Sequence, residues 1–244
     1  MSSLFHTFLY QPLFNTLVFF YNTIAFQDLG VAIILLTITI RFLLFPLFYK
    51  GFKNQTIMQK IQPELRKIQH EHKENKERQA QAMMDLYRQH NINPFSSFFL
   101  LFLQLPILIA LYQVFLKGFA DVALADLYGF VANPGHLNVL SLGLIDLGKR
   151  SILIVVLAAI AQYYQGRLSL PADRQGLPKQ DGAANDVARK MVYVGPVLTV
   201  VVLTALPSAV GLYWLTASAF SLVQQIYINR VIYGDNSRDN EKTA

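Results

Sequence analysis

Cysteine is absent from this sequence of 244 residues, and charged residues make up only 15% of it. Without cysteine the chain has no disulfide, no thiolate metal ligand, no cysteine nucleophile and no cysteine to carry a lipid anchor. Hydrophobic residues account for 53% of the chain and the mean hydropathy is +0.34, which is too apolar for an ordinary soluble domain. The composition therefore predicts an integral membrane protein held in the bilayer by its own apolar segments.

The motifs of common catalytic and cofactor sites are also missing. The sequence has no phosphate-binding glycine loop, no His-Glu metal spacing and no nucleophile elbow. Its histidines are scattered along the chain, at His6, His70, His72, His90 and His136. We therefore expect no enzyme, no metal and no cofactor, and a function driven by binding and partitioning. The net charge of +6 does not indicate nucleic-acid readout, because the basic residues sort by side of the membrane.

Five apolar segments reach or approach the roughly 20 residues needed to cross the hydrocarbon core. They cover residues 29–49, 95–116, 152–164, 191–206 and 208–228. The third and fourth are short, which bilayer thinning or burial in a helix bundle accommodates. The predicted fold is an all-α integral membrane protein with five transmembrane helices.

Lys and Arg are distributed unevenly between the segments that flank these spans. None occurs in residues 1–28, nine occur in 50–93, three in 117–150, five in 167–190 and three after residue 228. This places 17 on one side of the membrane and three on the other. Because Lys and Arg accumulate in cytoplasmic loops, the N-terminus is predicted to be outside and the C-terminus in the cytoplasm.

Residues 1–28 are predicted to form an amphipathic helix on the outer surface. Asn15 and Asn22 share one face, and the opposite face is apolar. That apolar face carries Leu13, Leu17, Phe20 and Ile24. A signal peptide is the alternative, but a basic n-region and a small-x-small cleavage site are missing.

A polar segment, residues 51–92, is predicted to form a cytoplasmic helical hairpin within a five-span core over residues 29–230. Two apolar stripes at helical spacing line it: Ile57, Ile61, Leu65 and Ile68, then Ala80, Met83, Met84 and Tyr87. The run "HEHKENKER" between the stripes reads as the turn, and Pro63 should begin or kink a helix. Residues 171–186 are predicted to be a flexible cytoplasmic connector, and residues 231–244 a short cytoplasmic tail.

Arg41 lies inside the first predicted span. A charge at the centre of a span costs roughly 2.5–3.5 kcal/mol on insertion scales, so it normally faces a bundle interior or a water-filled cavity. Snorkelling is one alternative, yet Arg41 lies about 13 Å from the end marked by Lys50, near the limit of its reach. An ion pair is another, but the interiors of the spans contain no Asp or Glu. A hydrated cavity open to the cytosol explains Arg41 best.

Other spans supply polar groups that could line such a cavity. They are Thr37, Gln104, Gln162, Gln165, Tyr213, Trp214, Thr216 and Ser218. Any one of them could instead join helices by a hydrogen bond, as such residues commonly do in lipid. Their joint presence with an unpaired Arg41 favours a hydrophilic groove.

The motifs "TITIRFLLFPL", "MQKIQPELRKIQHEH", "LFLQLPILIALYQVF", "IDLGK" and "LPSAVGLYWLTASAFSLVQQIYINR" occur in this order along the chain. Together they closely resemble the YidC/Oxa/Alb family of membrane protein insertases, over residues 29–230. The resemblance implies a bacterial plasma (inner) membrane protein whose five spans surround a groove open to the cytosol and to lipid. The lack of cysteine departs from lipoprotein members, and the short, nearly neutral tail makes us expect no ribosome docking through it.

The resemblance also implies roles for single residues and for partners. Arg41 matches the groove arginine, Thr37 the polar residue one turn before it, and Tyr213 and Trp214 the aromatic residues along the substrate path. Gln104 matches the glutamine of an "LxQxP" motif, whereas both Gln162 and Gln165 fit the third-span position. The implied partners are nascent membrane proteins, the lipid bilayer and, through the hairpin, the ribosome, the signal-recognition pathway and a Sec translocon.

Three other functions remain as alternatives. A small solute transporter or anion channel would use Arg41 as a solute site, but it predicts an inverted repeat and helices broken within the membrane, and we expect neither. A scaffold built on the hairpin would leave Arg41 unexplained. An intramembrane enzyme has no catalytic set of residues in the sequence.

Overall fold

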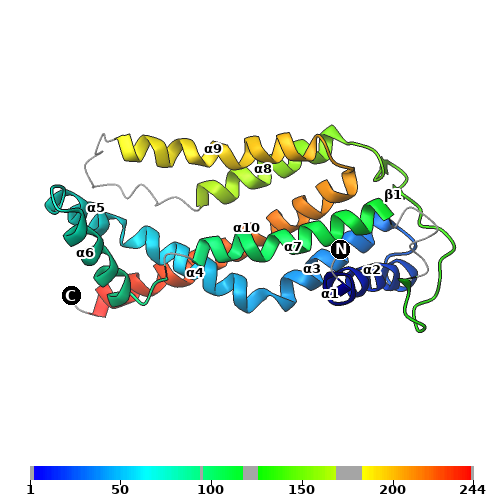
Figure 1. Cartoon of the computed structure of the whole chain (residues 1–244), viewed down its shortest axis with the longest axis horizontal. Helices are drawn as coiled ribbons and strands as arrows, with labels where there is room; N and C mark the ends of the chain where they lie inside the picture. The colour runs from blue at the N-terminus through cyan, green and yellow to red at the C-terminus, as the bar shows by residue number, and fades with distance from the viewer. Residues whose placement is uncertain (1–2, 94–95, 118–125, 169–182, 243–244) are drawn as a thin grey trace.

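A computed structural model describes residues 3–93, 96–117, 126–168 and 183–242. Over these residues the regular secondary structure is helical apart from one small two-stranded hairpin, which confirms the predicted all-α class. The helices run largely along the long axis of the molecule (Figure 1). The helical hairpin and the C-terminal part of the chain lie at one end of this axis, and the strands lie at the other.

One continuous N-terminal helix is built from α1 (Ser3–Phe5), the π-helical η1 (His6–Tyr10) and α2 (Gln11–Thr23). Some of its apolar residues, among them Phe14 and Leu17, are buried against the helices that follow, whereas Phe8 is 74% exposed. Of the predicted apolar face, Leu17 is buried whereas Ile24 is 52% exposed, so the buried face only partly coincides with the predicted one.

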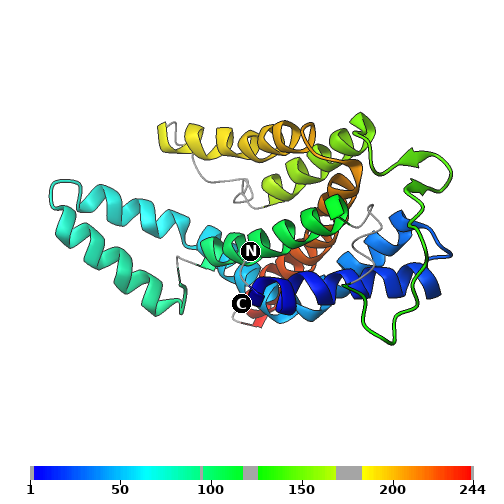
Figure 2. The ribbon, with the colours of Figure 1, turned by 45° about the vertical axis from the view of Figure 1, so that its right-hand side comes forward.

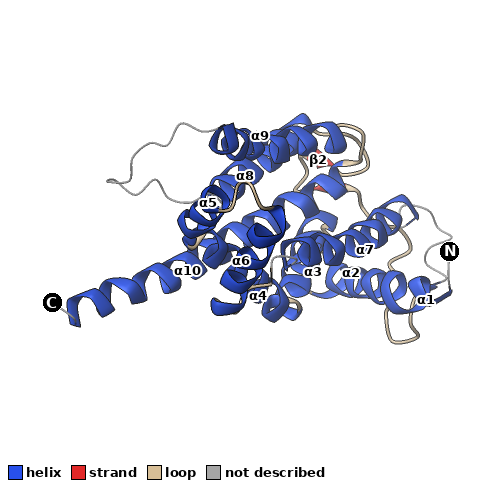
Figure 3. Cartoon of the chain, turned by 60° about the vertical axis from the view of Figure 1, so that its left-hand side comes forward, coloured by secondary structure: helices blue, strands red, loops and turns tan. Residues whose placement is uncertain are grey.

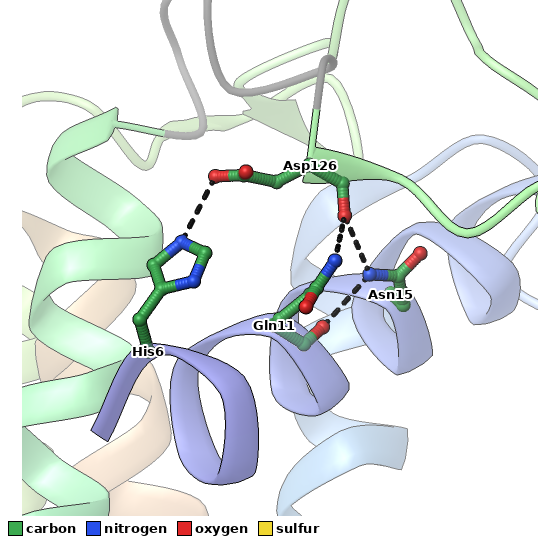
Figure 4. Close-up of polar contacts among 4 residues, drawn as sticks. All are labelled: His6, Gln11, Asn15 and Asp126. Carbon is green, nitrogen blue, oxygen red and sulfur yellow. Dashed lines mark hydrogen bonds and ion pairs between the residues drawn. The ribbon is translucent and has the colours of Figure 1, made fainter. Parts of the chain in front are cut away.

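The polar face of this helix binds a distant segment (Figure 4). Asn15 is only 3% exposed; its Nδ2 donates to the carbonyl oxygen of Asp126 over 3.0 Å, and its Oδ1 accepts from the Tyr128 amide. His6 Nε2 lies 3.3 Å from Asp126 Oδ2, and Gln11 also donates to the Asp126 carbonyl. The sequence analysis placed Asn15 on the polar face but did not identify this partner. Helical periodicity identifies a polar face but not the backbone groups that come to satisfy it.

The first predicted span is not one straight helix. It consists of α3 (Leu29–Leu43) and α4 (Phe45–Lys60), which meet at Leu44 with a bend of 69°. Pro46, in the first turn of α4, explains the bend because it has no N–H and its ring collides with the carbonyl four residues earlier. Our expectation of unbroken spans was wrong here.

The helical hairpin consists of α5 (Gln62–Glu71) and α6 (Lys76–Gln89), and it projects from the helix bundle (Figure 2). Its buried residues are Ile61, Leu65, Leu86 and Ile92. Ile57, Ile68, Met83 and Tyr87 from the two predicted stripes pack against them. Met84 departs from the prediction, because it is 44% exposed.

The remaining helices are α7 (Ser96–Lys117), α8 (Ile152–Leu168), α9 (Ala183–Leu203) and α10 (Ser208–Lys242). Helix α10 packs against α3, α4, α7 and α8, whereas α9 packs mainly on α8. The C-terminal part of α10 extends beyond the bundle, well past the predicted end of the span at residue 228 (Figure 3). Most of the predicted connector, residues 171–182, lies outside the described residues.

Membrane crossing was tested on the described helices by length and apolar composition. No single helix meets both criteria, and only α3 and α4 taken together do so, as a bent pair. Shorter apolar stretches occur at Phe102–Leu116, Ile152–Leu168 and Val192–Leu203. The count of five spans therefore stays a prediction.

The strand hairpin pairs β1 (Leu140–Ser141) antiparallel with β2 (Ile145–Asp146) and is fixed to the start of α3 by Asp28. The Asp28 carboxylate caps α3 by accepting from the Val31 amide, and it also accepts from Ser141 Oγ over 2.8 Å and from the Leu142 amide. Burial opposes ionisation of Asp28, but these hydrogen bonds outweigh it and lower the pKa of the carboxyl below its ordinary value.

Candidate functional site

Arg41 lies in the last turn of α3, just before the bend, and is only 7% exposed. Its Nη2 donates to Gln104 Oε1 over 3.3 Å, and its guanidinium carbon lies 4.4 Å from the centre of the Phe48 ring. The bend places Phe48, on α4, under the guanidinium, where a cation–π contact contributes about 1–2 kcal/mol. Within the described part of the chain no carboxylate lies within ion-pair distance of Arg41. The charge is therefore oriented but not neutralised.

Gln104 connects Arg41 to the last helix. While its Oε1 accepts from Arg41, its Nε2 donates to the hydroxyl of Tyr213, a residue that is 2% exposed. This polar chain joins α3, α7 and α10 through groups that were all predicted as site residues. A glutamine suits the central position because its amide accepts at one atom and donates at the other.

Thr37 and Thr216 use their hydroxyls within their own helices. Thr37 is 1% exposed and donates to the carbonyl of Ile33, and Thr216 donates to the carbonyl of Leu212. Such bonds satisfy the hydroxyl without joining two helices. Trp214 is half-buried and packs against the main core. The structure thus places these three near the predicted site but gives none of them a polar contact with Arg41.

A second polar contact joins α8 and α10. Ser218, 6% exposed, donates to Gln162 Oε1 over 3.3 Å. Gly195 of α9 lies beside this glutamine, and a Cβ there would be in ordinary contact with Gln162 Cγ at 3.4 Å. Gln165, the other glutamine left open by the sequence, is half-buried.

Two features of the site region were missed by the sequence analysis. One is Phe48, whose ring contacts Arg41; its spacing of seven residues from Arg41 was visible, but the bend that brings the two together was not.

The other is a buried polar cluster of α4 and α10, formed by Thr56, Gln225 and Asn229. Gln225 Nε2 donates to Thr56 Oγ1 and to Asn229 Oδ1, each over 2.9 Å, and the Thr56 hydroxyl also donates to Asn229 Oδ1 over 2.9 Å. The sequence signal for this cluster was the spacing of Gln225 and Asn229, four residues apart in an apolar helix.

Comparison with known proteins finds one matching family model and relatives that share one name. The family model described as 60Kd inner membrane protein matches residues 19–236. The chain is 33% identical over 204 residues to a protein of Clostridium tetani, covering 83% of this chain and 82% of the relative. It is 31% identical over 224 residues to one of Fusobacterium nucleatum, covering 91% of this chain and 97% of that protein. A longer relative from Syntrophobacter fumaroxidans is 31% identical over 226 residues, covering 92% of this chain and 38% of the relative. All three bear the name Membrane protein insertase YidC.

Proposed function

This chain belongs to the YidC/Oxa/Alb family of membrane protein insertases, and we propose that it takes the hydrophilic ends of nascent membrane proteins into a groove open to the cytosol and releases their apolar segments sideways into lipid. The YidC relatives of this chain are proteins of the bacterial inner membrane, and theirs is not a family of catalytic enzymes. The groove, its lining and its direction of opening are the parts proposed here.

The observation that carries the proposal is the buried, unneutralised charge of Arg41. Its neighbours, Gln104 and Phe48, orient the guanidinium without supplying a counter-ion. A buried cation that lacks a carboxylate attracts an anion more strongly than a surface residue does, because the surroundings screen it less. An acidic residue near the end of a substrate is therefore a suitable transient partner, while water in the groove would limit the cost of removing it from the cytosol.

Lateral release is proposed to occur between α7 and α10, the second and fifth predicted spans. The hydrogen bond between Gln104 and Tyr213 joins these two helices, so it must break for a segment to pass. A substrate carboxylate that takes over Arg41 would remove one of the two contacts that orient Gln104. Binding of the charge would thereby weaken the closed state of the exit.

The free energy comes from the substrate and from the membrane. Burying an apolar segment in lipid is favourable without any nucleotide. For an acidic end that moves outward, the membrane potential adds about 2.3 kcal/mol per charge per 100 mV. The short apolar stretches of α8 and α9 would thin the bilayer locally and lower the barrier.

The proposed orientation follows the 17 Lys and Arg residues on one side against three on the other, which puts the N-terminus outside and the C-terminus in the cytoplasm. The α5–α6 hairpin then faces the cytosol, where nascent chains arrive. We propose that it contacts the ribosome, the signal-recognition pathway or a Sec translocon.

Photo-crosslinking during synthesis tests the groove. A photoreactive amino acid at Trp214 should crosslink to a nascent substrate with an acidic end, whereas the same group at Val201, 62% exposed on α9, is the control. Crosslinks at Trp214 that disappear when the substrate acids are neutralised support the proposal. Crosslinks of equal yield at both positions contradict it.

The same preparation addresses the transporter alternative. The bend at Leu44 is one feature that a transporter would share, whereas the relatives do not support that function. Solute flux that depends on Arg41, with no substrate crosslink, would favour the transporter.

A further inference from the structure

The first strand of the hairpin and the turn after it have an inverted distribution of polar and apolar residues. In β1 and the turn after it, the polar Ser141 points inward and is 7% exposed, while Leu140, Leu142 and Leu144 are 45%, 73% and 83% exposed. A hairpin that packs on a core in water shows the opposite pattern, with apolar residues inside and polar residues outside. The outward face of this hairpin therefore suits an apolar surrounding.

The backbone is held in place on both sides of these leucines. Asp28 accepts from Ser141 Oγ and from the Leu142 amide, and the Ala209 amide at the start of α10 donates to the Leu147 carbonyl over 3.1 Å. Gly30 allows the close approach of the hairpin, since a Cβ there would lie 2.0 Å from Ser141 Oγ. The leucines thus project from an anchored element.

Two exposed apolar residues next to Asp28 occupy unfavourable backbone conformations. Leu142 has a φ of +50° and Phe26 a φ of +52°, in the left-handed region where Gly and Asn are favoured. Phe26 is 94% exposed. In water, Gly or Asn at either position would be more stable than Leu or Phe, because each tolerates a positive φ and exposes less apolar surface. Large apolar side chains here indicate that contact with an apolar phase compensates.

The surroundings of the hairpin match the edge of a membrane. Two residues after Arg150, α8 begins with Ile152 and Leu153, which are 72% and 56% exposed and continue an apolar exposed surface along that helix. Lys149 and Arg150, both exposed, lie between the hairpin and this surface in sequence; Lys149 Nζ pairs with Asp146 Oδ2 over 3.0 Å. Basic residues beside an apolar tip suit anionic lipid headgroups.

We propose that Leu140, Leu142, Leu144 and Phe26, here termed the outer apolar tip, insert into the bilayer leaflet on the side opposite the α5–α6 hairpin. The tip would hold the outer ends of α3, α8 and α10 at a fixed depth through Asp28 and Leu147. That this leaflet is the outer one rests on the orientation given in the proposed function.

A fluorescence experiment tests the tip, and the absence of cysteine makes single labelling clean. Leu140→Cys and Leu144→Cys are each labelled with an environment-sensitive fluorophore in the full chain, reconstituted into vesicles of phosphatidylcholine and phosphatidylglycerol. His136→Cys, at an exposed polar position in the same segment, is the matched control. Helix content of each labelled chain is checked by circular dichroism.

We expect blue-shifted emission at 140 and 144 that lipid-borne nitroxides quench and aqueous iodide does not, with the reverse at 136. Iodide quenching at 140 and 144 equal to that at 136 would overturn the proposal. Protection that disappears when the chain is diluted to one copy per vesicle would overturn it too, by identifying a second copy as the partner. Repeating the measurement with Arg41→Ala separates the tip from the insertase proposal, since the emission should not change.

Discussion

The guanidinium of Arg41 donates a hydrogen bond to Oε1 of Gln104 over 3.3 Å, from α3 to α7. This contact uses a neutral acceptor where a carboxylate would have formed an ion pair. The neutrality of Gln104 leaves the charge of Arg41 available to a substrate.

The substitution Gln104→Glu tests that idea. It places a carboxylate within reach of Arg41, and the resulting ion pair would satisfy the charge internally. We expect insertion of a substrate with an acidic end to fall about as far as in Arg41→Ala, on the order of tenfold, corresponding to about 1.4 kcal/mol. Gln104→Leu is the control and should lose less, since Arg41 stays unpaired. Equal insertion by Gln104→Glu and the wild type in reconstituted vesicles would count against the account.

Asp28 should stabilise the outer end of the bundle in a pH-dependent way. Asp28→Ala removes the cap of α3 and the contacts to Ser141 and Leu142, and we expect a loss of about 1–2 kcal/mol in the free energy of unfolding near neutral pH. Because the folded-state pKa is lowered, this contribution is complete above the unfolded pKa of about 3.9 and is lost as pH falls through the folded value. Denaturation in detergent across this range measures the difference between variant and wild type. A difference that stays constant well below pH 4 would show that the charge of Asp28 is not the cause.

Gly30 is expected to be required for the packing of the strand hairpin on α3. In Gly30→Ala the new Cβ would collide with Ser141 Oγ and Cβ, at 2.0 and 2.8 Å. We expect a loss of about 1–3 kcal/mol in the free energy of unfolding, as for other overpacked sites. The double variant Gly30→Ala, Ser141→Gly should recover part of this loss, and a double-mutant cycle measures the recovery. Strictly additive losses would contradict the collision.

Thr56 should fix α4 to α10. Thr56→Val keeps the shape but removes the hydroxyl that bonds Gln225 and Asn229, so we expect a loss of about 1–3 kcal/mol in the free energy of unfolding and faster amide exchange in α4. Thr39→Val is a matched control, because the Thr39 hydroxyl bonds only within its own helix in the described structure. Similar losses in the two variants would remove the distinction between these hydroxyls.

The sequence predicted helix positions well where apolar length alone determines them. The expected segments 95–116 and 152–164 correspond to Ser96–Lys117 and Ile152–Leu168. It did not predict the bend at Leu44, although Pro46 was visible, because proline in a membrane helix is tolerated where neighbours compensate. The partner of Asn15, the Asp126 backbone, was not predicted because it lies 111 residues away in sequence.

The residues of the candidate site were predicted from the sequence, but most of the contacts between them were not. Arg41, Gln104 and Tyr213 were chosen as polar groups in apolar helices, and the structure brings these three together. Ser218 and Gln162 form a separate pair. Which polar residues meet depends on helix rotation and on the bend, which single-helix patterns do not encode.

The most direct test of the account is insertion of a single-span protein with a short acidic N-terminal tail into vesicles that contain only this chain. Wild type, Arg41→Ala and Arg41→Lys are compared at equal reconstituted amounts, with protein-free vesicles as the baseline. We expect insertion above this baseline for wild type, loss in Arg41→Ala and retention in Arg41→Lys, because the positive charge attracts the acidic tail. Equal insertion by wild type and Arg41→Ala would contradict the role of the charge, and insertion by wild type no better than in empty vesicles would contradict the insertase function itself.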